Sequence, residues 1–268
     1  MAVRLVRIAA FVAAALAATP VAHAEDIPVD LELVLAVDVS WSVDPMEARL
    51  QREGYIAALR HPRVAAAIAA GPYQRIALAY MEWAGTEHVT TVIGWRAVDS
   101  AAALEDVAQI LAQAPVIRAR RTAPGAAIEA ATAMLLGNGF AGERMVIDVS
   151  GDGIANAGPS VAVARDRAVE AGIVINGLPI VTMAPTRLYG GDTVDLVKYY
   201  RECVTGGPGS FVVVADDFVN FAEAILKKLI LEIAQAPRAP VRRHGLLWQA
   251  QATQRSTPPP GFCDTVYW

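Results

Sequence analysis

Three oxygen-bearing side chains follow an apolar run at every second position. The run covers residues 34–37, and Asp38, Ser40 and Ser42 come next in the pattern Asp-x-Ser-x-Ser. A buried strand does not need polar side chains where it ends, whereas Mg2+ and Ca2+ prefer carboxylate, hydroxyl and water oxygens. Open α/β sheets bind ligands beyond the carboxyl ends of their strands, so the pattern favours a metal site. The alternative is that Asp or Ser only caps the next helix.

Two distant segments carry oxygen ligands of the same kind. Thr122 stands just before an Ala-rich segment, residues 126–136, that is predicted to be a helix. Asp152 lies in a Gly-Asp-Gly turn after a second apolar run, residues 145–149. Both residues therefore stand where a predicted element begins or ends, as Asp38 does.

Together the three segments resemble the metal-ion-dependent adhesion site of von Willebrand factor A (vWA) domains. The resemblance covers about residues 30 to 235. The segments Leu-Ala-Val-Asp-Val-Ser at residues 35–40 and Val-Ile-Asp-Val-Ser-Gly-Asp-Gly at residues 146–153 are similar to those of an uncharacterised bacterial secreted branch of that family. In the family the serines and the threonine commonly touch the metal, while the aspartates act directly or through water. The resemblance thus implies five metal ligands: Asp38, Ser40, Ser42, Thr122 and Asp152.

The chemistry of these side chains favours binding over turnover. Two carboxylates neutralise a divalent ion incompletely, and Mg2+ (or Mn2+ or Ca2+) held partly through water keeps an exchangeable position. A carboxylate from a partner protein, Asp or Glu, is the natural occupant of that position. Hydrolysis would need a general base near metal-bound water, and neither strand-end loop supplies a His or Glu for that role. The nearest histidine, His88, is expected at the opposite end of the sheet.

An enzyme on the same scaffold is the main alternative. A serine hydrolase would carry Gly-x-Ser-x-Gly, but the sequence around Ser150 lacks the first glycine. A phosphotransferase that uses Asp38 would usually carry a second acid where Ser40 stands. A solute-binding protein would typically need two lobes and more residues.

Near the site, Asp148 and Asn156 are candidates for supporting roles, Asn156 by orienting Asp152.

Trp41 stands inside the first metal loop, where the family usually has a smaller residue. It could be buried against the neighbouring helix. It could also form an apolar wall beside the metal, against which a partner's carboxylate would pack.

The N-terminus predicts export. Residues 1–24 carry Arg4 and Arg7, then an apolar core, then Ala-His-Ala, which is typical of a cleavable secretory signal peptide. The core is shorter than the ~20 residues that span a bilayer. The protein is therefore expected in the periplasm or outside a bacterial cell, without stable membrane insertion. The net charge of -4 would become -6 once the two arginines are removed, and a mildly acidic surface argues against nucleic acid.

The alternation of strands and helices predicts one doubly wound α/β domain, the Rossmann-like arrangement of vWA domains. We expect a mostly parallel six-stranded sheet with one antiparallel edge strand and helices on both faces, because most strands are apolar runs rich in Val and Ile. Gly85-Thr86-Glu87 is typical of a hairpin turn. The strands are expected at about residues 31–37, 74–83, 88–95, 143–149, 173–179 and 210–215.

Two helices have clear signals. The first should begin with Asp44 as N-cap, Pro45 at the first helical position and Glu47 three residues after the cap. The last should span residues 217–234, because apolar side chains recur there at helical spacing and form a core-facing stripe.

The domain is expected to cover residues 25–235, after a signal peptide at 1–24 and before a Pro-rich tail at 236–268. The aromatic end of the tail either packs back on the domain or docks on a partner. Cys203 and Cys263 make an even count in an oxidising compartment, which favours a disulfide, with two free thiols as the alternative. Such a bond would close a loop of about 60 residues worth roughly 4 kcal/mol.

Overall fold

The computed structural model describes residues 26–181, 193–216, 220–234 and 262–263. Within this part, a five-stranded sheet has the order β4-β3-β2-β6-β7 and is parallel except for the antiparallel pair β3 and β4. A separate two-stranded sheet pairs β1 with β5 and was not predicted. The strands are β1 (Ile27–Val29), β2 (Leu31–Asp38), β3 (Ile76–Trp83), β4 (Val89–Val98), β5 (Phe140–Gly142), β6 (Met145–Gly151) and β7 (Ile173–Pro179).

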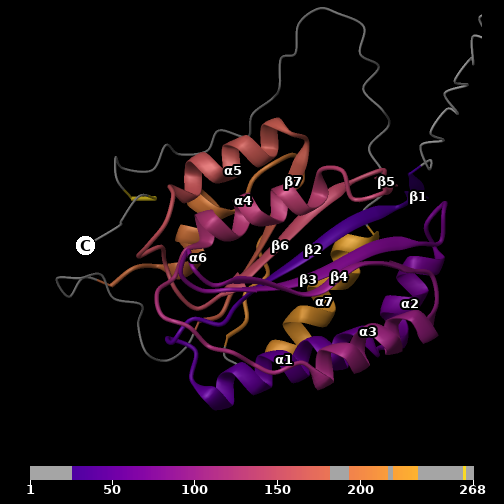
Figure 1. Cartoon of the computed structure of the whole chain (residues 1–268), viewed down its shortest axis with the longest axis horizontal. Helices are drawn as coiled ribbons and strands as arrows, with labels where there is room; N and C mark the ends of the chain where they lie inside the picture. Colours follow the sequence, from indigo (N-terminus) through magenta and orange to yellow (C-terminus); the bar gives the residue numbers. More distant parts are fainter. Residues whose placement is uncertain (1–25, 182–192, 217–219, 235–261, 264–268) are drawn as a thin grey trace, which may run out of the picture.

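Helices cover both faces of the large sheet, as predicted. In Figure 1, α1, α2, α3 and α7 lie on one side of the strands, and α4, α5 and α6 lie on the other. A short π-helix, η1 (Tyr200–Val204), continues α6. The helices are α1 (Pro45–Leu59), α2 (Pro62–Ala69), α3 (Ala101–Gln113), α4 (Pro124–Leu135), α5 (Val161–Glu170), α6 (Leu196–Tyr199) and α7 (Phe221–Ala234).

The central strand β2 shows why the sheet needs both helix layers. All of its residues are buried. Leu33 and Leu35 point into the core beneath α1 and α7, while Val34 and Ala36 point into the core beneath α4 and α5. A fully buried Leu or Val stabilises the fold by about 1.5–3 kcal/mol, so an apolar run without alternation is what this central position requires.

The sixth predicted strand is the one correction to the sheet. Residues 210–215 run parallel to β7 but form only isolated bridges, through Val212 and Ala215. The ladder begins regularly, because Gly177 donates its amide to Phe211 and accepts from Val213. The next donor in a parallel ladder would be residue 179, which is Pro179 and has no N–H. One bond of the ladder is therefore missing, and the segment is not a regular strand.

The helix signals are confirmed where the structure describes them. The side chain of Asp44 accepts from the amides of Met46 and Glu47, and the Glu47 carboxylate accepts from the Asp44 amide, which completes the capping box of α1. On α7 the predicted stripe is buried, including Phe221, Ile225 and Leu229. The predicted start of this helix at residues 217–219 lies outside the described residues.

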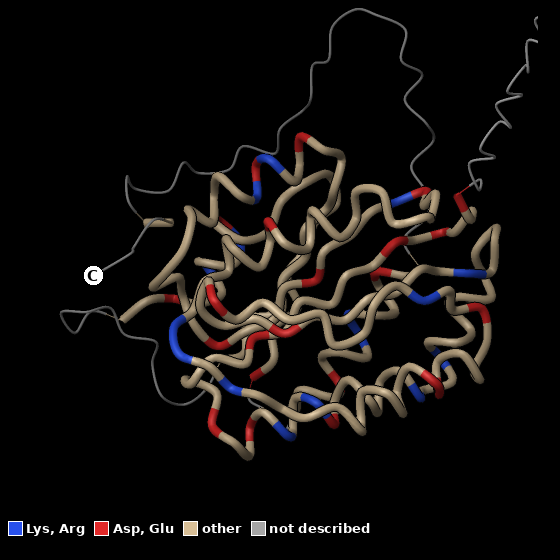
Figure 2. Tube along the Cα trace, viewed as in Figure 1, with Lys and Arg blue, Asp and Glu red and all other residues tan. Residues whose placement is uncertain are grey.

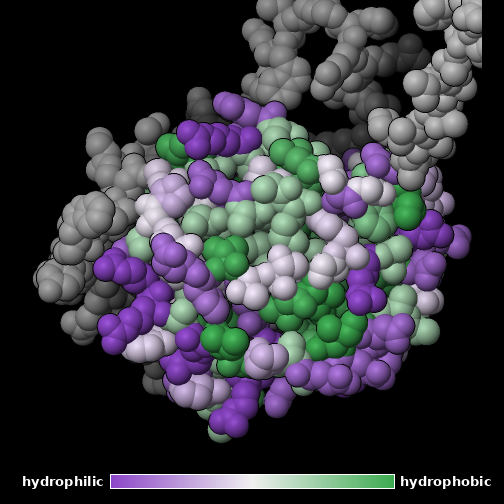
Figure 3. Space-filling view, in the orientation of Figure 1, coloured by the Kyte–Doolittle hydropathy of each residue, from purple (hydrophilic) through white to green (hydrophobic). Residues whose placement is uncertain are grey.

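The predictions for the chain ends also lie outside the described residues, because residues 1–25, 235–261 and 264–268 are not included. Within the described part, no helix has the length and hydropathy to cross a membrane. On the face shown in Figure 3, hydrophobic side chains gather between the two helix layers, over the edge strand β4.

Candidate metal centre

The strand register brings the polar loops to one edge of the sheet. Asp38 pairs with Trp83 on β3, and Val37 pairs with Ser150 on β6, so β2, β3 and β6 end at nearly the same level. The chain leaves β2 toward β3 on one side, while β6 lies on the other side. This is the topological switch point at which open sheets bind ligands. The loops gather at the left end of Figure 1.

Four of the five predicted ligands form a chain of hydrogen bonds at this edge. The amide of Ser40 donates to Oδ1 of Asp38 at 2.7 Å. The hydroxyls of Ser40 and Ser42 lie 2.8 Å apart, and the Ser42 hydroxyl donates to Oδ1 of Asp152 at 2.7 Å. The first and third loops, which are 110 residues apart in sequence, therefore share one cluster of oxygens.

The fifth predicted ligand, Thr122, lies beside the same cluster. A Cβ placed on Gly153 would be 3.6 Å from the Thr122 hydroxyl and 4.0 Å from the Ser42 hydroxyl, so both hydroxyls flank this glycine. Asn156 fixes the Thr122 loop, because its side chain accepts from the Thr122 amide at 2.8 Å and its own amide donates to the Thr122 carbonyl at 2.9 Å. The Asn156 bonds that the structure shows thus go to Thr122 rather than to Asp152, the partner we had expected.

The electrostatics of the cluster favour a cation. Asp38 is fully buried, its Oδ2 has no hydrogen-bond partner, and no ion pair to it is found among the described residues. Burial, followed by the charge of Asp152, raises the pKa of Asp38 well above its ordinary value. Burial also raises the pKa of Asp152, with a further contribution from Glu47. Two neighbouring carboxylates that resist ionisation are stabilised when a positive charge lies between them.

The donor set fits a hard divalent ion. It consists of two carboxylates and three hydroxyls, and such oxygens suit Mg2+, Mn2+ and Ca2+. In the described part of the chain there is no group of three or more His, Cys, Asp or Glu side chains that could hold a metal. A metal at this edge would therefore depend on the hydroxyls of Ser40, Ser42 and Thr122.

Two residues that contact the site were not predicted from the sequence. Gln51 donates its amide to the Asp38 carbonyl at 2.9 Å from the buried face of α1. Tyr200 approaches the Asp38 carboxylate: a Cβ on Gly151 would lie 2.7 Å from Asp38 Oδ2 and 2.9 Å from the Tyr200 hydroxyl. Neither residue carries a sequence signal, because only the fold brings it to the site.

His88 lies at the edge of the sheet where the metal loops are, so its predicted place at the opposite end was wrong. The hairpin extends from β3, which is parallel to β2, and its Ala84 carbonyl accepts from the Ala123 amide at 2.7 Å. The imidazole nevertheless lines a separate cavity of about 210 Å3 with Glu82 and Ile117, and none of the five predicted ligands lines that cavity.

Asp148 and Ser150 point away from the predicted ligands, into the core beneath α1 and α7. Asp148 forms an ion pair with Lys228, and the Ser150 hydroxyl lies 3.0 Å from the hydroxyl of Tyr55. Both residues are fully buried. A supporting role for Asp148 beside the metal is therefore excluded by its direction on β6.

Trp41 is exposed, which decides between the two alternatives for this residue. Its side chain is 53% exposed. The guanidinium of Arg120 lies 4.5 Å from its ring centre, and Arg118 donates to its carbonyl at 3.0 Å. The ring therefore stands at the rim of the metal loop and is not packed into a neighbouring helix.

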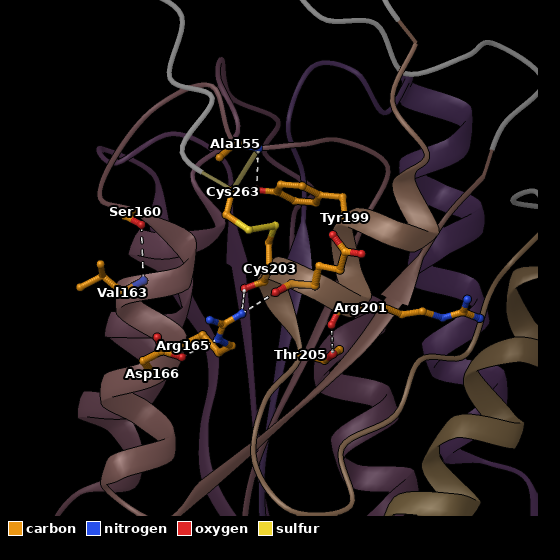
Figure 4. Close-up of a disulfide and its surroundings, with 11 residues drawn as sticks. Ala155, Ser160, Val163, Arg165, Asp166, Tyr199, Arg201, Cys203, Thr205 and Cys263 are labelled. Carbon is orange, nitrogen blue, oxygen red and sulfur yellow. Dashed lines mark hydrogen bonds and ion pairs between the residues drawn. A yellow bond between two sulfur atoms is a disulfide. The ribbon is translucent and has the colours of Figure 1, made fainter. Parts of the chain in front are cut away.

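Cys203 and Cys263 form a disulfide, as predicted. The bond holds the preceding residue, Phe262, against Tyr199, with ring centres 6.2 Å apart. The Tyr199 hydroxyl in turn accepts from the amide of Ala155, in the loop of Asp152, at 3.2 Å (Figure 4). The end of the chain is thus linked through one tyrosine to the third metal loop.

Comparison with known proteins places the fold. Residues 28–237 match the model of a family described as "Protein of unknown function (DUF1194)". No curated protein matches the chain. Among solved structures, the pilus adhesin SpaC from Lactobacillus rhamnosus GG is similar, with 14% identity, a TM-score of 0.58, and coverage of 78% of this chain and 31% of that chain.

Two further solved structures are similar. Proximal thread matrix protein 1 from the mussel byssus, with a zinc-occupied MIDAS motif, has 14% identity and a TM-score of 0.57, over 79% of this chain and 50% of that chain. A von Willebrand factor type A structure from Catenulispora acidiphila has 16% identity and a TM-score of 0.50, over 76% and 43%. The chain spans half or less of the length of these proteins. At such identities the likeness establishes the vWA fold alone.

Proposed function

The chain belongs to the DUF1194 family and has the vWA fold, and on this basis we propose that it is an exported, metal-dependent module that binds an acidic group of a partner protein. The observation that carries the proposal is the buried carboxylate of Asp38, which faces Asp152 and two serine hydroxyls without a cationic partner among the described residues. The zinc-occupied motif of the mussel protein supports divalent-metal binding on this fold.

We assign Mg2+, or Mn2+ or Ca2+, to a site formed by Asp38, Ser40, Ser42, Thr122 and Asp152. When bound, the ion would offer a coordination position to an outside carboxylate. The chain's own residues prepare that position: the serine hydroxyls are oriented by each other and by Asp152. Ser42 and Trp41 are exposed, so a partner can reach this side of the cluster.

Calorimetry of the mature protein with Mg2+, Mn2+ and Ca2+ tests the site. We expect wild type to bind one ion and Asp38→Ala to lose binding, because its carboxylate is the most buried member of the cluster. Asp166→Ala is the matched control, since Asp166 is exposed on α5 and pairs with Arg165 rather than with any of the five predicted ligands. Identical titrations for wild type and Asp38→Ala would show that the site assignment is wrong.

Partner binding is tested separately from metal binding. Trp41→Ala should weaken binding of a partner and leave metal affinity nearly unchanged, because the exposed ring is not a ligand. Asp152→Ala should remove both. A pull-down of exported proteins by the wild type, with and without a chelator, would identify a partner, and a partner retained equally in chelator would contradict metal dependence.

The enzyme alternative, a hydrolase on this scaffold, is weakened by the position of Ser150. Its hydroxyl is fully buried and lies against Tyr55, so a substrate cannot reach it. The adhesin and matrix proteins among the similar structures also suggest a role without turnover. A metal-dependent hydrolase activity that Ser150→Ala abolishes would favour the enzyme alternative.

We further propose three parts for the chain: a signal peptide at 1–24, the vWA-like domain at 25–235 and a Pro-rich tail at 236–268. Mass spectrometry of protein from the cell envelope should find Glu25 at the N-terminus. Recovery of intact Met1 from the cytosol would contradict the proposed periplasmic or secreted location.

A further inference from the structure

An arginine-rich segment runs beside the first metal loop. Arg118, Arg120 and Arg121 follow within four positions, and there is no Asp or Glu between Asp106 and Glu129. The segment is attached to the metal loop by a parallel bridge between Ser40 and Ala119, in which the Ala119 amide donates to the Val39 carbonyl at 3.1 Å. The three arginines thus lie next to the loop of Ser40 and Ser42 because of the backbone pairing.

The guanidinium groups of these arginines are not paired with acidic side chains in the described part of the chain. None of the three arginines forms an ion pair with a described residue, whereas Arg52, Arg60 and other arginines elsewhere do. Arg120 is exposed, and its guanidinium lies over the exposed ring of Trp41 in a cation–π contact, which restricts the movement of the arginine side chain. Arg118 is held by the Trp41 carbonyl, and its Nε is buried without a hydrogen-bond partner.

The backbone of this segment is held from both sides. Arg121 has a φ of 69°, a left-handed conformation that costs a non-glycine residue about 1–2 kcal/mol. The β3–β4 hairpin maintains it, because the Gly85 amide donates to the Arg120 carbonyl at 3.1 Å and the Ala84 carbonyl accepts from the Ala123 amide. Such an over-determined conformation next to Thr122 is typical of a binding loop.

Acidic residues also stand near the site. Asp44 and Glu47 stand at the start of α1, and the charge of Glu47 already contributes to the raised pKa of Asp152. Figure 2 shows both basic and acidic stretches of the trace at this end of the sheet. An extended polyanion such as nucleic acid would meet these carboxylates, and the net charge of -4 opposes it as well. A short acidic segment that lies on the arginine side only would meet no such repulsion.

We propose that Trp41, Arg118, Arg120 and Arg121 form an arginine rim that selects an acidic protein segment, with one carboxylate at the metal and further carboxylates on the rim. This inference rests on the proposed function and names the partner's chemistry. Arg120 is the main contact, because it is exposed, pairs with no described carboxylate, and has a planar group that can make a bidentate bond to a carboxylate. The rim adds specificity to a metal contact that any single carboxylate could make.

Two blocked Gly/Ser peptides test the proposal on the mature, disulfide-bonded protein in Mg2+. One carries a single Asp, and the other carries the same Asp with additional Glu residues on one side only. We expect the multiply acidic peptide to bind about tenfold more tightly. Arg120→Gln should remove this advantage and change binding of the single-Asp peptide by less than about twofold. Arg63→Gln, the same change at an exposed position on α2, should leave the advantage intact.

The outcomes separate this inference from the proposed function. If both peptides bind equally in Mg2+ and chelator abolishes both, the metal-dependent function stands and the rim is overturned. If the multiply acidic peptide keeps its Arg120-dependent advantage in chelator, the rim is supported and the metal-dependent function fails. If Arg120→Gln and Arg63→Gln reduce the advantage equally, the effect is general charge attraction and the rim is overturned.

Discussion

Two buried aspartates on neighbouring strands, Asp38 on β2 and Asp148 on β6, have opposite surroundings. Both are fully buried. Asp148 faces the cation of Lys228, which also contacts Glu232 at 2.7 Å. Asp38 faces a second carboxylate, Asp152, and among the described residues it forms no ion pair. The carboxylate of Asp148 is therefore compensated by Lys228 of the protein itself. The carboxylate of Asp38 would be compensated by a cation that binds from outside.

The core cluster, which consists of Asp148, Lys228 and Glu232, is held by contacts between several elements of the fold. Glu232 accepts from Asn176 at 3.1 Å, and its backbone carbonyl accepts from Arg144 at 2.5 Å, so β6, β7 and α7 are tied together. Lys228 is fully buried as well. Two carboxylates share one ammonium here, and this arrangement is stable only while all members are present. At the sheet edge one of the hydroxyl ligands, Ser42, is exposed, which suits an ion that exchanges with solvent.

The largest expected effect is in the core cluster. Lys228→Met would leave Asp148 and Glu232 buried without a cation, and we expect the free energy of unfolding to fall by about 3–5 kcal/mol. Urea unfolding measures this loss. Lys227→Met is the matched control, because Lys227 is the preceding residue on α7 and is exposed. Equal stability of the two variants would show that Lys228 does not compensate the buried carboxylates.

The next effect is a pH dependence from Asp148. Burial, and then the charge of Glu232, raise its pKa to about 7, although Lys228 lowers it. The folded state therefore holds a proton that the unfolded state has already lost above pH 4. Stability from this group is present at low pH and is lost as the pH rises toward 7. Between pH 5 and 7 we expect wild type to lose about 2 kcal/mol relative to Asp148→Asn.

Urea unfolding of wild type and Asp148→Asn at pH 5, 6 and 7 checks this sign. A constant difference between the two proteins across that range would mean that Asp148 does not titrate there. An increase in the relative stability of wild type with pH would mean that Lys228 outweighs burial and Glu232, contrary to the stated balance.

A smaller effect, of opposite sign, is expected at the sheet edge. Asp38→Asn keeps an oxygen for the Ser40 amide and removes a buried charge that repels Asp152. Without metal we expect the variant to be more stable than wild type by about 1–2 kcal/mol. It should also lose the rise in melting temperature that Mg2+ gives wild type. Asp148→Asn should keep that rise, and a loss of the Mg2+ response in both variants would break the contrast between the two aspartates.

The sequence predicted the edge site better than the core cluster for a physical reason. Asp38, Ser40 and Ser42 follow a strand at a spacing that a buried element does not need. Lys228 and Glu232 have the i,i+4 spacing of an ordinary surface pair on a helix, so their burial depends on how α7 packs. That packing direction is set by distant contacts that local periodicity does not report.

Other differences have equally local causes. The strand at residues 210–215 was predicted from its valines, but the missing amide of Pro179 on the neighbouring strand interrupts its pairing. His88 was misplaced because the end of a hairpin depends on which strand it extends, and β3 is parallel to β2. Tyr199 on α6 and Tyr200 on η1 lie near the site because the helix layer of α4, α5 and α6 packs on the sheet. Patterns within one segment predict elements, whereas contacts between segments require the topology.

The contacts of the disulfide with Phe262 and Tyr199 offer a test of how firmly the metal site at the sheet edge is held. The disulfide of Cys203 and Cys263 holds Phe262 on Tyr199, and Lys198 lies 5.5 Å from the centre of the Phe262 ring. Tyr199 passes this support to the Ala155 amide in the third metal loop (Figure 4). The loop that carries Asp152 is therefore supported by a tyrosine that the disulfide-linked Phe262 packs against.

The smallest expected effect follows from removing this support. Tyr199→Phe deletes the hydroxyl that accepts from Ala155 and keeps the ring that packs on Phe262, so the contact to the third metal loop is lost while the ring packing stays. A hydrogen bond of this kind is worth about 1 kcal/mol, and we expect Mg2+ affinity to fall about threefold to fivefold, with a fall of about 2–4 °C in melting temperature. Tyr73→Phe, at an exposed position near the start of β3, is the control. The Cys203→Ser, Cys263→Ser double variant should lower Mg2+ affinity by a similar factor if the disulfide acts through Tyr199. If the double variant lowers stability but leaves Mg2+ affinity unchanged, the disulfide only staples the tail, and the edge site is held by its own loops.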